Sequence, residues 1–270
     1  MLQAFGSRVF QKTNKMPLTL FPLKHIPLVA PGDHLQDLIL ASLEKNQLAL
    51  QDGDIVVVAQ KIVSKAENRL VNLTTIEASD KAHEYAELTG KDPRLLELIL
   101  QESREVLRTR QNLIIVEHRL GFISANAGID HSNVSGSWGD AEDWVLLLPE
   151  NPDVSASRLR NVLEAACGCK IGVLIIDSHG RAWRLGTVGV AIGLAGMPGL
   201  VDLRGKPDLF DYQLRITQVA AADELAAAAS LMMGQAREGT PVVIARGFPY
   251  ALREGSLPEL IRPKELDLFR

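Results

Sequence analysis

The sequence has 270 residues, enough to bury the core of one large domain or of two modest ones. Its 46% hydrophobic and 23% charged residues are ordinary for a soluble globular protein. The net charge of −4 argues against a nucleic-acid partner and against an anionic membrane surface, although it is compatible with a local phosphate site.

The two cysteines, Cys167 and Cys169, are separated by a single residue. This spacing is too short for an easy disulfide, and the second pair that a zinc site needs is missing, so we expect two reduced thiols. No apolar run approaches the ~20 residues of a membrane span, and residues 1–16 lack the apolar core of a signal peptide. We therefore predict a cytoplasmic protein with a flexible N-terminal extension.

Turn and cap signals divide the first half of the chain into short elements. The expected order is a strand in 18–31 interrupted by prolines, a helix capped by Asp33 and ending near Lys45, a buried strand at 55–59, an amphipathic helix at 74–89, a helix from Asp92 to about Glu105, and a strand at 113–116. Arg104, Arg108 and Arg110 then fall on a solvated or interface edge.

Turn and cap signals divide the second half of the chain into short elements in the same way. The expected order is a strand at 145–149, a helix from Ser155, a buried strand at 171–176, a glycine-containing strand at 187–195, a short strand at 213–216, an alanine-rich helix capped by Thr217 and ended by Gly234, a strand at 241–245, and a short helix in 257–270. The glycines of 187–195 indicate a strand that another backbone or a ligand approaches closely.

Two aspartates follow apolar segments of this pattern. Asp177 comes directly after the apolar run 171–176 and is followed by Ser178, and Asp130 ends the segment 121–130. The carboxyl end of a buried strand is where an α/β protein presents its chemistry, and carboxylate and hydroxyl oxygens are the ligands that Mg²⁺ and Mn²⁺ prefer. The loop at Gln235 offers a further oxygen. The alternative is that each aspartate caps the turn or helix after its strand.

Lys61 and Lys65 follow the strand at 55–59 and lie four residues apart, so on a helical turn they share one face. Two lysines there can hold phosphate as point charges, or they form a solvated basic turn. The sequence contains neither a P-loop nor the G-x-G-x-x-G dinucleotide fingerprint. A bound nucleotide would therefore depend on these lysines and on the backbone amides of other loops.

Three histidines, His118, His131 and His179, fall in the same segments, but without the spacing of a zinc site. His131 and His179 adjoin the two aspartates and are the better candidates for substrate contact. No G-x-S-x-G or comparable nucleophile context occurs, which disfavours covalent catalysis.

At five ordered motifs the sequence resembles the coenzyme F-420:L-glutamate ligase family, over about residues 18 to 250. The motifs are GDIVVVAQKIVSKAENR (53–69), ANAGIDHSNV (125–134), IIDSHGRAWR (175–184), GVAIGLAG (189–196) and ADELAAAASLMMGQAREGTPVVIARG (222–247). The resemblance implies an α+β fold with mixed sheets and flanking helices, in an intertwined homodimer. It implies an extension at 1–16, a ligase domain of two subdomains at 17–250 and a tail at 251–270.

The resemblance also implies an activity. Members of the family use GTP and divalent cations, Mg²⁺ or Mn²⁺ at two sites with K⁺ as a further expectation, to join L-glutamate to the deazaflavin precursor F-420-0, and can add further γ-linked glutamates. An acyl phosphate is the expected intermediate, and phosphoryl transfer needs positioning and charge neutralisation more than a protein nucleophile. This would explain why no catalytic triad is visible.

Matching motif to motif assigns roles to residues of this chain. Asp130 and Asp177 are similar to the ligands of a first metal, and Ser178 and Gln235 to those of a second. Lys61 and Lys65, with Asp130 and Asp177, are the expected catalytic residues. The expected GTP contacts are Val29, Ala30, Pro31, Gly32, Gln60, Lys61, Lys65, Asn133, Met233, Gly234, Gln235, Ala236, Arg237, Glu238, Gly239 and Thr240.

The chain departs from the family pattern beside these positions. His179 and Ala182 stand where Phe and Pro are expected, and Asp211-Tyr212 replaces Gly-Arg. These departures leave open the same ligase chemistry on another carboxylate. A catalytically silent nucleotide-binding regulatory dimer is a second alternative, disfavoured by the retained metal and nucleotide positions, and an NAD-type oxidoreductase is weaker still.

Overall fold

The computed structural model describes residues 16–132, 134 and 141–268. Its helices are α1 (Leu35–Lys45), α2 (Gln60–Ala66), α3 (Asp80–Thr89), α4 (Pro93–Gln101), α5 (Pro152–Cys167) and α6 (Ala221–Met233). Its strands are β1 (Thr19–Pro22), β2 (Ile55–Ala59), β3 (Leu70–Asn72), β4 (Ser103–Arg110), β5 (Leu113–His118), β6 (Ile123–Ala125), β7 (Trp144–Leu146), β8 (Gly172–Arg181), β9 (Arg184–Ala195), β10 (Val201–Asp202), β11 (Gln218–Val219) and β12 (Val242–Arg246). None of the helices in the described residues combines the length and apolar character needed to cross a membrane.

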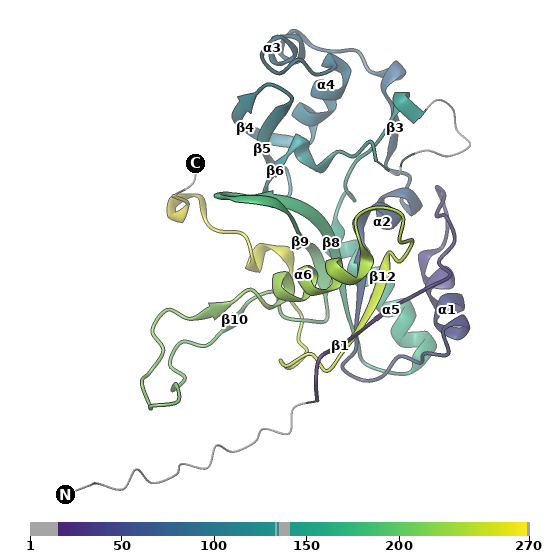
Figure 1. The fold of residues 1–270 in the computed structure, drawn as a ribbon, viewed down its shortest axis with the longest axis vertical. Helices are drawn as coiled ribbons and strands as arrows, with labels where there is room; N and C mark the ends of the chain where they lie inside the picture. Colours follow the sequence, from purple (N-terminus) through teal and green to yellow (C-terminus); the bar gives the residue numbers. More distant parts are fainter. Residues whose placement is uncertain (1–15, 133, 135–140, 269–270) are drawn as a thin grey trace, which may run out of the picture.

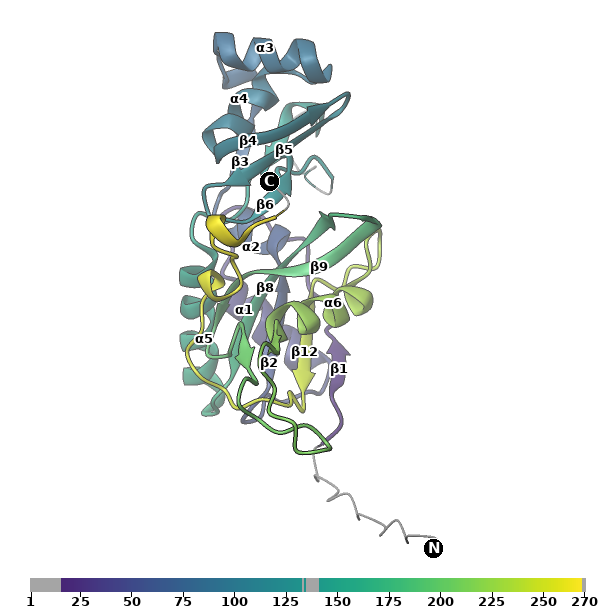
Figure 2. The same cartoon turned by 90° about the vertical axis from the view of Figure 1, so that its left-hand side faces the viewer.

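A mixed five-stranded sheet in the order β1-β12-β2-β8-β9 forms the larger part of the molecule, in which β2 and β8 are parallel and the other pairs antiparallel. Helices α1 and α5 cover one face and α6 covers the other (Figures 1 and 2). Along β8, Val173 and Ile175 belong to the hydrophobic core on the face covered by α1 and α5. Leu174 and Ile176 belong to the core on the face covered by α6. The uninterrupted apolar run in this strand therefore reflects burial on both faces.

A separate hydrophobic core lies between α3, α4 and two smaller sheets, β4-β5-β6 and β3-β7. Leu96 and Ile99 of α4 are fully buried there together with Ile114 and Val116 of β5. Figure 1 shows these elements stacked above the five-stranded sheet. The fold is thus mixed α and β with several sheets, as expected.

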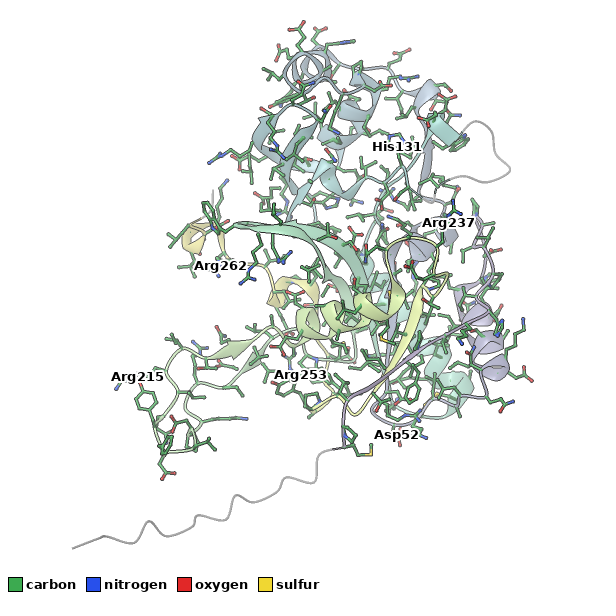
Figure 3. All side chains as sticks on the ribbon, viewed as in Figure 1. Asp52, His131, Arg215, Arg237, Arg253 and Arg262 are labelled. Carbon is green, nitrogen blue, oxygen red and sulfur yellow. A yellow bond between two sulfur atoms is a disulfide. The ribbon has the colours of Figure 1, made fainter. Side chains whose placement is uncertain are left out.

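Residues 201–219 leave the body of the molecule as an arm whose base is the short pair β10 and β11 (Figure 1). Arg215 lies near its tip (Figure 3). Leu209, Phe210 and Ile216 are 69%, 85% and 87% exposed, which is unusual for side chains of this size. The expected strand at 213–216 is wrong, because in this part of the chain Gln213 forms only an isolated bridge with Pro207.

Two helices in the first half are shorter than predicted. In place of one helix at 74–89, a 3₁₀ turn at Leu73–Thr75 precedes α3, whose start is fixed by the Ser79 hydroxyl accepting from the Ala82 amide. The helix predicted to reach Glu105 ends at Gln101, and Ser103–Arg110 forms β4 instead. Antiparallel pairing with β5 outweighs the helical pattern of this segment.

Three predicted helix caps are also wrong. The Asp33 carboxylate accepts from the Ala30 amide at 2.8 Å and closes the turn before α1 rather than capping it. Helix α6 begins at Ala221, four residues after Thr217. Helix α5 begins at Pro152 instead of Ser155, because Asn151 caps it and proline fits the first helical turn.

The predicted helix in 257–270 is reduced to 3₁₀ turns at Leu257–Glu259 and Lys264–Leu266.

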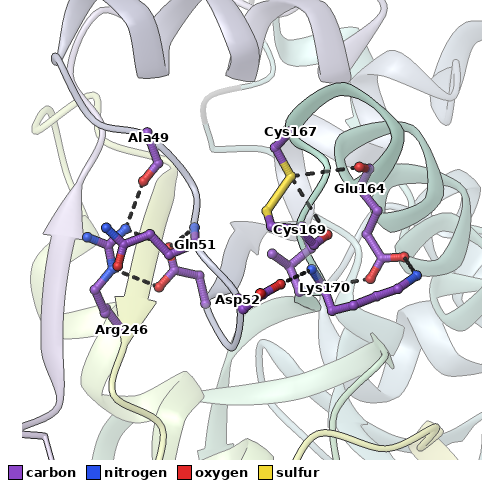
Figure 4. The surroundings of a disulfide bond; sticks show 10 residues. Ala49, Gln51, Asp52, Glu164, Cys167, Cys169, Lys170 and Arg246 are labelled. Atoms are coloured by element: carbon purple, nitrogen blue, oxygen red, sulfur yellow. Dashed lines mark hydrogen bonds and ion pairs between the residues drawn. A yellow bond between two sulfur atoms is a disulfide. The ribbon is translucent and has the colours of Figure 1, made fainter.

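The prediction of two reduced thiols is contradicted as well, because Cys167 and Cys169 form a disulfide at the end of α5 (Figure 4). Gly168 between them has a φ of +68° and reverses the chain. The two Cα atoms consequently lie 5.4 Å apart, which is within the range that a disulfide spans. The spacing argument failed because it took no account of this tight turn.

Candidate functional site

A cavity of about 500 Å³ lies where α2, the β6 segment, β8 and the loop after α6 meet. The lining includes both aspartates proposed as metal ligands, Asp130 and Asp177. It also includes Lys61 and Lys65. Segments separated by more than a hundred residues in the chain therefore share one cavity, as the cation hypothesis requires.

The register of the central sheet brings the first two of these segments together. Strands β2 and β8 run parallel with Ala59 opposite Ile176, so the residues that follow, Gln60 and Asp177, emerge at the same edge. Beyond this point α2 begins after β2, whereas β8 continues in a hairpin with β9. The prediction that the strand ends before Asp177 is therefore wrong: Asp177 is paired with Val190 inside a longer strand.

Asp130 is fixed by both its backbone and its side chain. Its amide and carbonyl exchange hydrogen bonds with Leu146 at 3.0 and 2.9 Å. The Gln60 side-chain amide donates to Asp130 Oδ2 at 2.7 Å, and the Lys61 ammonium forms an ion pair with the same oxygen. Ser64, one turn along α2, donates to Gln60 Oε1 and holds that amide in place. The predicted alternative of a simple helix cap does not describe this aspartate.

Burial is the largest influence on Asp130 and raises its pKa. Lys61 and Gln60 act in the opposite direction, and the negative charge of Asp177 adds to the rise. Lys65 has a lowered pKa because of burial and the neighbouring charge of Lys61. Two carboxylates and two ammonium groups thus influence one another in a confined space, an arrangement typical of functional sites.

Asp177 keeps its charge more readily. Burial favours the neutral acid, but His179, Lys61 and the Ser178 amide together outweigh it and lower the pKa of Asp177. His179 Nε2 lies 3.1 Å from Asp177 Oδ2. His179, the residue that departs from the family pattern, is thus in direct ionic reach of a proposed metal ligand.

Ser178 and Gln235 also meet, although 57 positions separate them in the chain. The Ser178 hydroxyl donates to Gln235 Oε1 at 2.9 Å, and Gln235 Nε2 donates to the Ser230 hydroxyl of α6 at 3.0 Å. The pair that the resemblance assigns to a second metal is therefore adjacent.

Most of the residues expected to contact GTP lie on the cavity wall. These are Val29, Gln60, Lys61, Lys65, Met233, Gly234, Gln235, Ala236, Glu238, Gly239 and Thr240. Ala30, Pro31, Gly32 and Arg237 do not line it, because the turn at 31–32 and the Arg237 side chain face outward. Asn133 lies outside the described residues. His131 is exposed (Figure 3) and does not line the cavity, whereas His179 does.

The cavity has further polar lining that sequence reasoning did not single out, notably Ser124, Asn126, Thr187 and Ser230. Ser124 and Asn126 fall inside the segment that leads to Asp130. They carried no charge and no motif spacing to mark them. Only the three-dimensional structure shows that they line the cavity.

The donor set of the cavity fits oxygen-seeking cations. Asp130 and Asp177 supply carboxylates, and Ser178 and Gln235 supply a hydroxyl and an amide oxygen. In the described part of the chain no cluster of three or more His, Cys, Asp or Glu side chains could hold a metal by itself. A cation here would thus use few protein ligands and leave positions open for water or phosphate, as is common for Mg²⁺.

Comparison with known proteins identifies the class to which this fold and cavity belong. Residues 24–247 match the model of the F-420-0:gamma-glutamyl ligase family, so the chain belongs to that family and is a ligase. The coenzyme F-420:L-glutamate ligase of Methanothermobacter thermautotrophicus is 47% identical over 94% of this chain and 100% of its own length. The proteins of the same name from Methanopyrus kandleri and Methanocaldococcus jannaschii are 45% and 44% identical, covering 92% and 83% of this chain and 97% and 87% of their own lengths.

Proposed function

We propose that this protein is a GTP-dependent ligase that joins L-glutamate to the carboxylate of coenzyme F-420-0, releasing GDP and phosphate. The observation that carries the proposal is the convergence of Asp130, Asp177, Lys61 and Lys65 on one cavity, in a chain that belongs to this ligase family. The names of its relatives supply the acceptor class and the amino acid.

The proposed reaction has two steps. A carboxylate oxygen of F-420-0 bonds to the γ-phosphorus of GTP while the bond from that phosphorus to the β–γ bridging oxygen breaks, and GDP leaves. The amine nitrogen of glutamate then bonds to the acyl carbon, the phosphate leaves with the electron pair of the carbon–oxygen bond, and the nitrogen loses a proton. Repeating both steps on the γ-carboxylate of the product, with a further GTP each time, would extend the chain with further γ-linked glutamates.

In this reaction the residues of the chain act mainly by position and charge. Lys61 and Lys65 neutralise the charge that phosphoryl transfer concentrates between donor and acceptor. Gln60 holds Asp130 in place through its 2.7 Å hydrogen bond, and Ser64 holds Gln60. Residues of the loop from Met233 to Thr240 line the cavity, and we assign the remaining nucleotide contacts to them.

The proposal includes two divalent cations, Mg²⁺ or Mn²⁺, held by Asp130 and Asp177 and by Ser178 and Gln235. When bound, such ions neutralise phosphate oxygens and orient the triphosphate. Support comes from the donor chemistry described above and from the mutual repulsion of Asp130 and Asp177, which a cation would relieve.

We further propose a homodimer of two-subdomain protomers, in which the ligase domain spans residues 17–250. The exposed apolar side chains of the arm, Leu209, Phe210 and Ile216, support this assembly because large apolar side chains exposed on one projecting segment are typical of an interaction surface. Separate hydrophobic cores support the division into subdomains.

The test is to incubate the protein with F-420-0, L-glutamate, GTP and Mn²⁺ while following product mass and GDP. Glutamylated F-420 together with stoichiometric GDP supports the proposal. GDP release without glutamylated product would assign the same chemistry to another carboxylate, and nucleotide binding without turnover would favour a regulatory dimer. Replacing GTP by ATP in a parallel reaction measures the nucleotide preference.

A further inference from the structure

One wall of the cavity carries polar atoms without partners. Ser124 is only 5% exposed, and its hydroxyl makes no hydrogen bond to any described residue. The side-chain oxygen of Asn126 is likewise buried and unpartnered within the described residues. Both residues line the cavity, and burial of a polar atom without a partner is costly, so a ligand that pairs with these atoms would be favoured.

The cavity places these two side chains near β8. Phe122, the residue before β6, has its ring 5.2 Å from that of His179 on β8. Ser124 and Asn126 line the same cavity as His179 and Asp177. The two unpartnered oxygens therefore belong to the cavity that also holds the proposed metal ligand Asp177.

The backbone after Ser124 is strained in a way that supports a function. Asn126, Ala127 and Gly128 have consecutive φ values of +52°, +53° and +66°. Left-handed backbone is tolerated by asparagine and glycine but costs energy at Ala127, which is fully buried. Such strain persists when the surroundings hold it, and it clusters at binding sites. Here it turns the chain between β6 and Asp130.

We propose that Ser124 and Asn126 bind the α-amino group of L-glutamate, an inference that rests on the proposed ligase function. The Asn126 side-chain oxygen can only accept a hydrogen bond, and the Ser124 hydroxyl can accept one as well as donate, so a single donating group satisfies both. Asp130 and Asp177 line the same cavity, so a cationic donor there lies near carboxylates as well. A primary ammonium group is such a donor.

The other substrates fit this wall less well. The phosphates of GTP and the ionised carboxylate of F-420-0 are acceptors, so they would leave the Asn126 oxygen unpartnered and add negative charge beside two aspartates. The residues proposed to contact GTP lie instead on α2, at Val29 and on the loop after α6. The amine is also the group that must lie beside the acyl carbon in the second step.

The test compares Ser124→Ala and Asn126→Gly with the wild type. Glycine is chosen at position 126 because it removes the side chain yet tolerates the left-handed backbone. Thr109→Ala is the matched control, since Thr109 lies on β4 of the same small sheet and its side chain is exposed. For each protein, KM is measured for L-glutamate, GTP and F-420-0, and so is inhibition by glutarate, which lacks the amine.

We expect KM for L-glutamate to rise about tenfold or more in both variants, because a hydrogen bond to a charged group is lost. KM for GTP and F-420-0 should stay within about twofold, and the preference for glutamate over glutarate should shrink by the same factor as the glutamate KM rises. Hydroxylamine trapping of the acyl phosphate as a hydroxamate should proceed at the wild-type rate. The Thr109→Ala control should match the wild type throughout.

Two results would overturn the inference: an unchanged glutamate KM and glutarate discrimination in both variants, or a parallel loss of hydroxamate formation, which would place these residues in phosphoryl transfer. Failure of the ligase proposal is distinguishable, because wild-type protein would then give neither hydroxamate nor glutamylated F-420.

Discussion

Glu102 is the centre of a buried charge network at the junction of α4, β4 and β5, and its replacement gives the sharpest stability prediction. Arg69 and Arg119 contact its two carboxylate oxygens at 3.0 and 2.7 Å, and His118 lies 3.5 Å away. Burial raises the pKa of Glu102, but the hydrogen bonds and charges of these three groups outweigh it and lower the pKa from 4.5 to about 2.

The size of the stability effect follows from the coupling between proton binding and folding. Lowering the pKa of Glu102 from 4.5 to about 2 corresponds to about 3 kcal/mol of stability. Because the folded pKa lies below the unfolded one, this contribution is complete above pH 4.5 and is lost as the pH falls toward 2. His118 acts in the same direction at higher pH: burial lowers its pKa, so stability falls as the pH drops below its ordinary value of 6.5.

We therefore expect Glu102→Gln to lower the free energy of unfolding at pH 7 by about 3 to 5 kcal/mol, since it leaves two arginines without their partner. Urea unfolding followed by circular dichroism at pH 7, 4.5 and 3 measures this, and the variant should lose most of the acid dependence below pH 4.5. Glu105→Gln is the control, because Glu105 pairs with Lys264 at the exposed surface and should change stability by no more than about 1 kcal/mol. Equal stability and an equal pH profile for Glu102→Gln and the wild type would refute the reasoning.

Three further predictions concern the site, the packing and the disulfide. Asp177→Ala should abolish turnover without changing the circular dichroism spectrum, and wild-type activity in that variant would contradict its assignment. Gly193→Ala should destabilise the fold by about 1 to 3 kcal/mol in urea unfolding, because a Cβ there would overlap Pro152, whereas Gly180→Ala in open space has no such contact and serves as its control. Cys167→Ser should lower stability by no more than about 2 kcal/mol, since the closed loop is very short, and a larger loss in thermal unfolding would show that the bond does more than restrict the unfolded chain.

The sequence was informative wherever one strong local signal decided the structure. The apolar runs of β2 and β8 predicted buried strands, and Lys61 and Lys65, which would share one face of a helix, do lie on a helix, α2. Signals that compete with tertiary pairing misled: the predicted helix extends to about Glu105, but Ser103 already begins β4, which pairs with β5. Caps were unreliable for a similar reason, since Asp33 satisfies a nearer turn amide first.

The same contrast between local signals and tertiary pairing holds for the candidate site. The sequence could propose that Asp130 and Asp177 meet, yet nothing local encodes the parallel register that puts Gln60 beside Asp177 or the bridge from Asp130 to Leu146. Ser124 and Asn126 were missed because uncharged side chains acquire meaning only from the face on which they lie and from the partners they lack.

The arrangement also accounts for catalysis without a protein nucleophile. Strand β2 ends where α2 begins, so the first turn of this helix delivers Gln60 and Lys61 to the level at which β8 presents Asp177. The Lys61 ammonium is then shared between a direct ion pair with Asp130 and the longer-range field of Asp177. In the proposed reaction, charges fixed in this way would need no reorganisation on binding of a triphosphate, and such preorganisation is the main demand of phosphoryl transfer. Changing the β2–β8 register by one residue would move Gln60 and Lys61 away from both carboxylates, so the core packing of the sheet and the chemistry of the site depend on the same pairing.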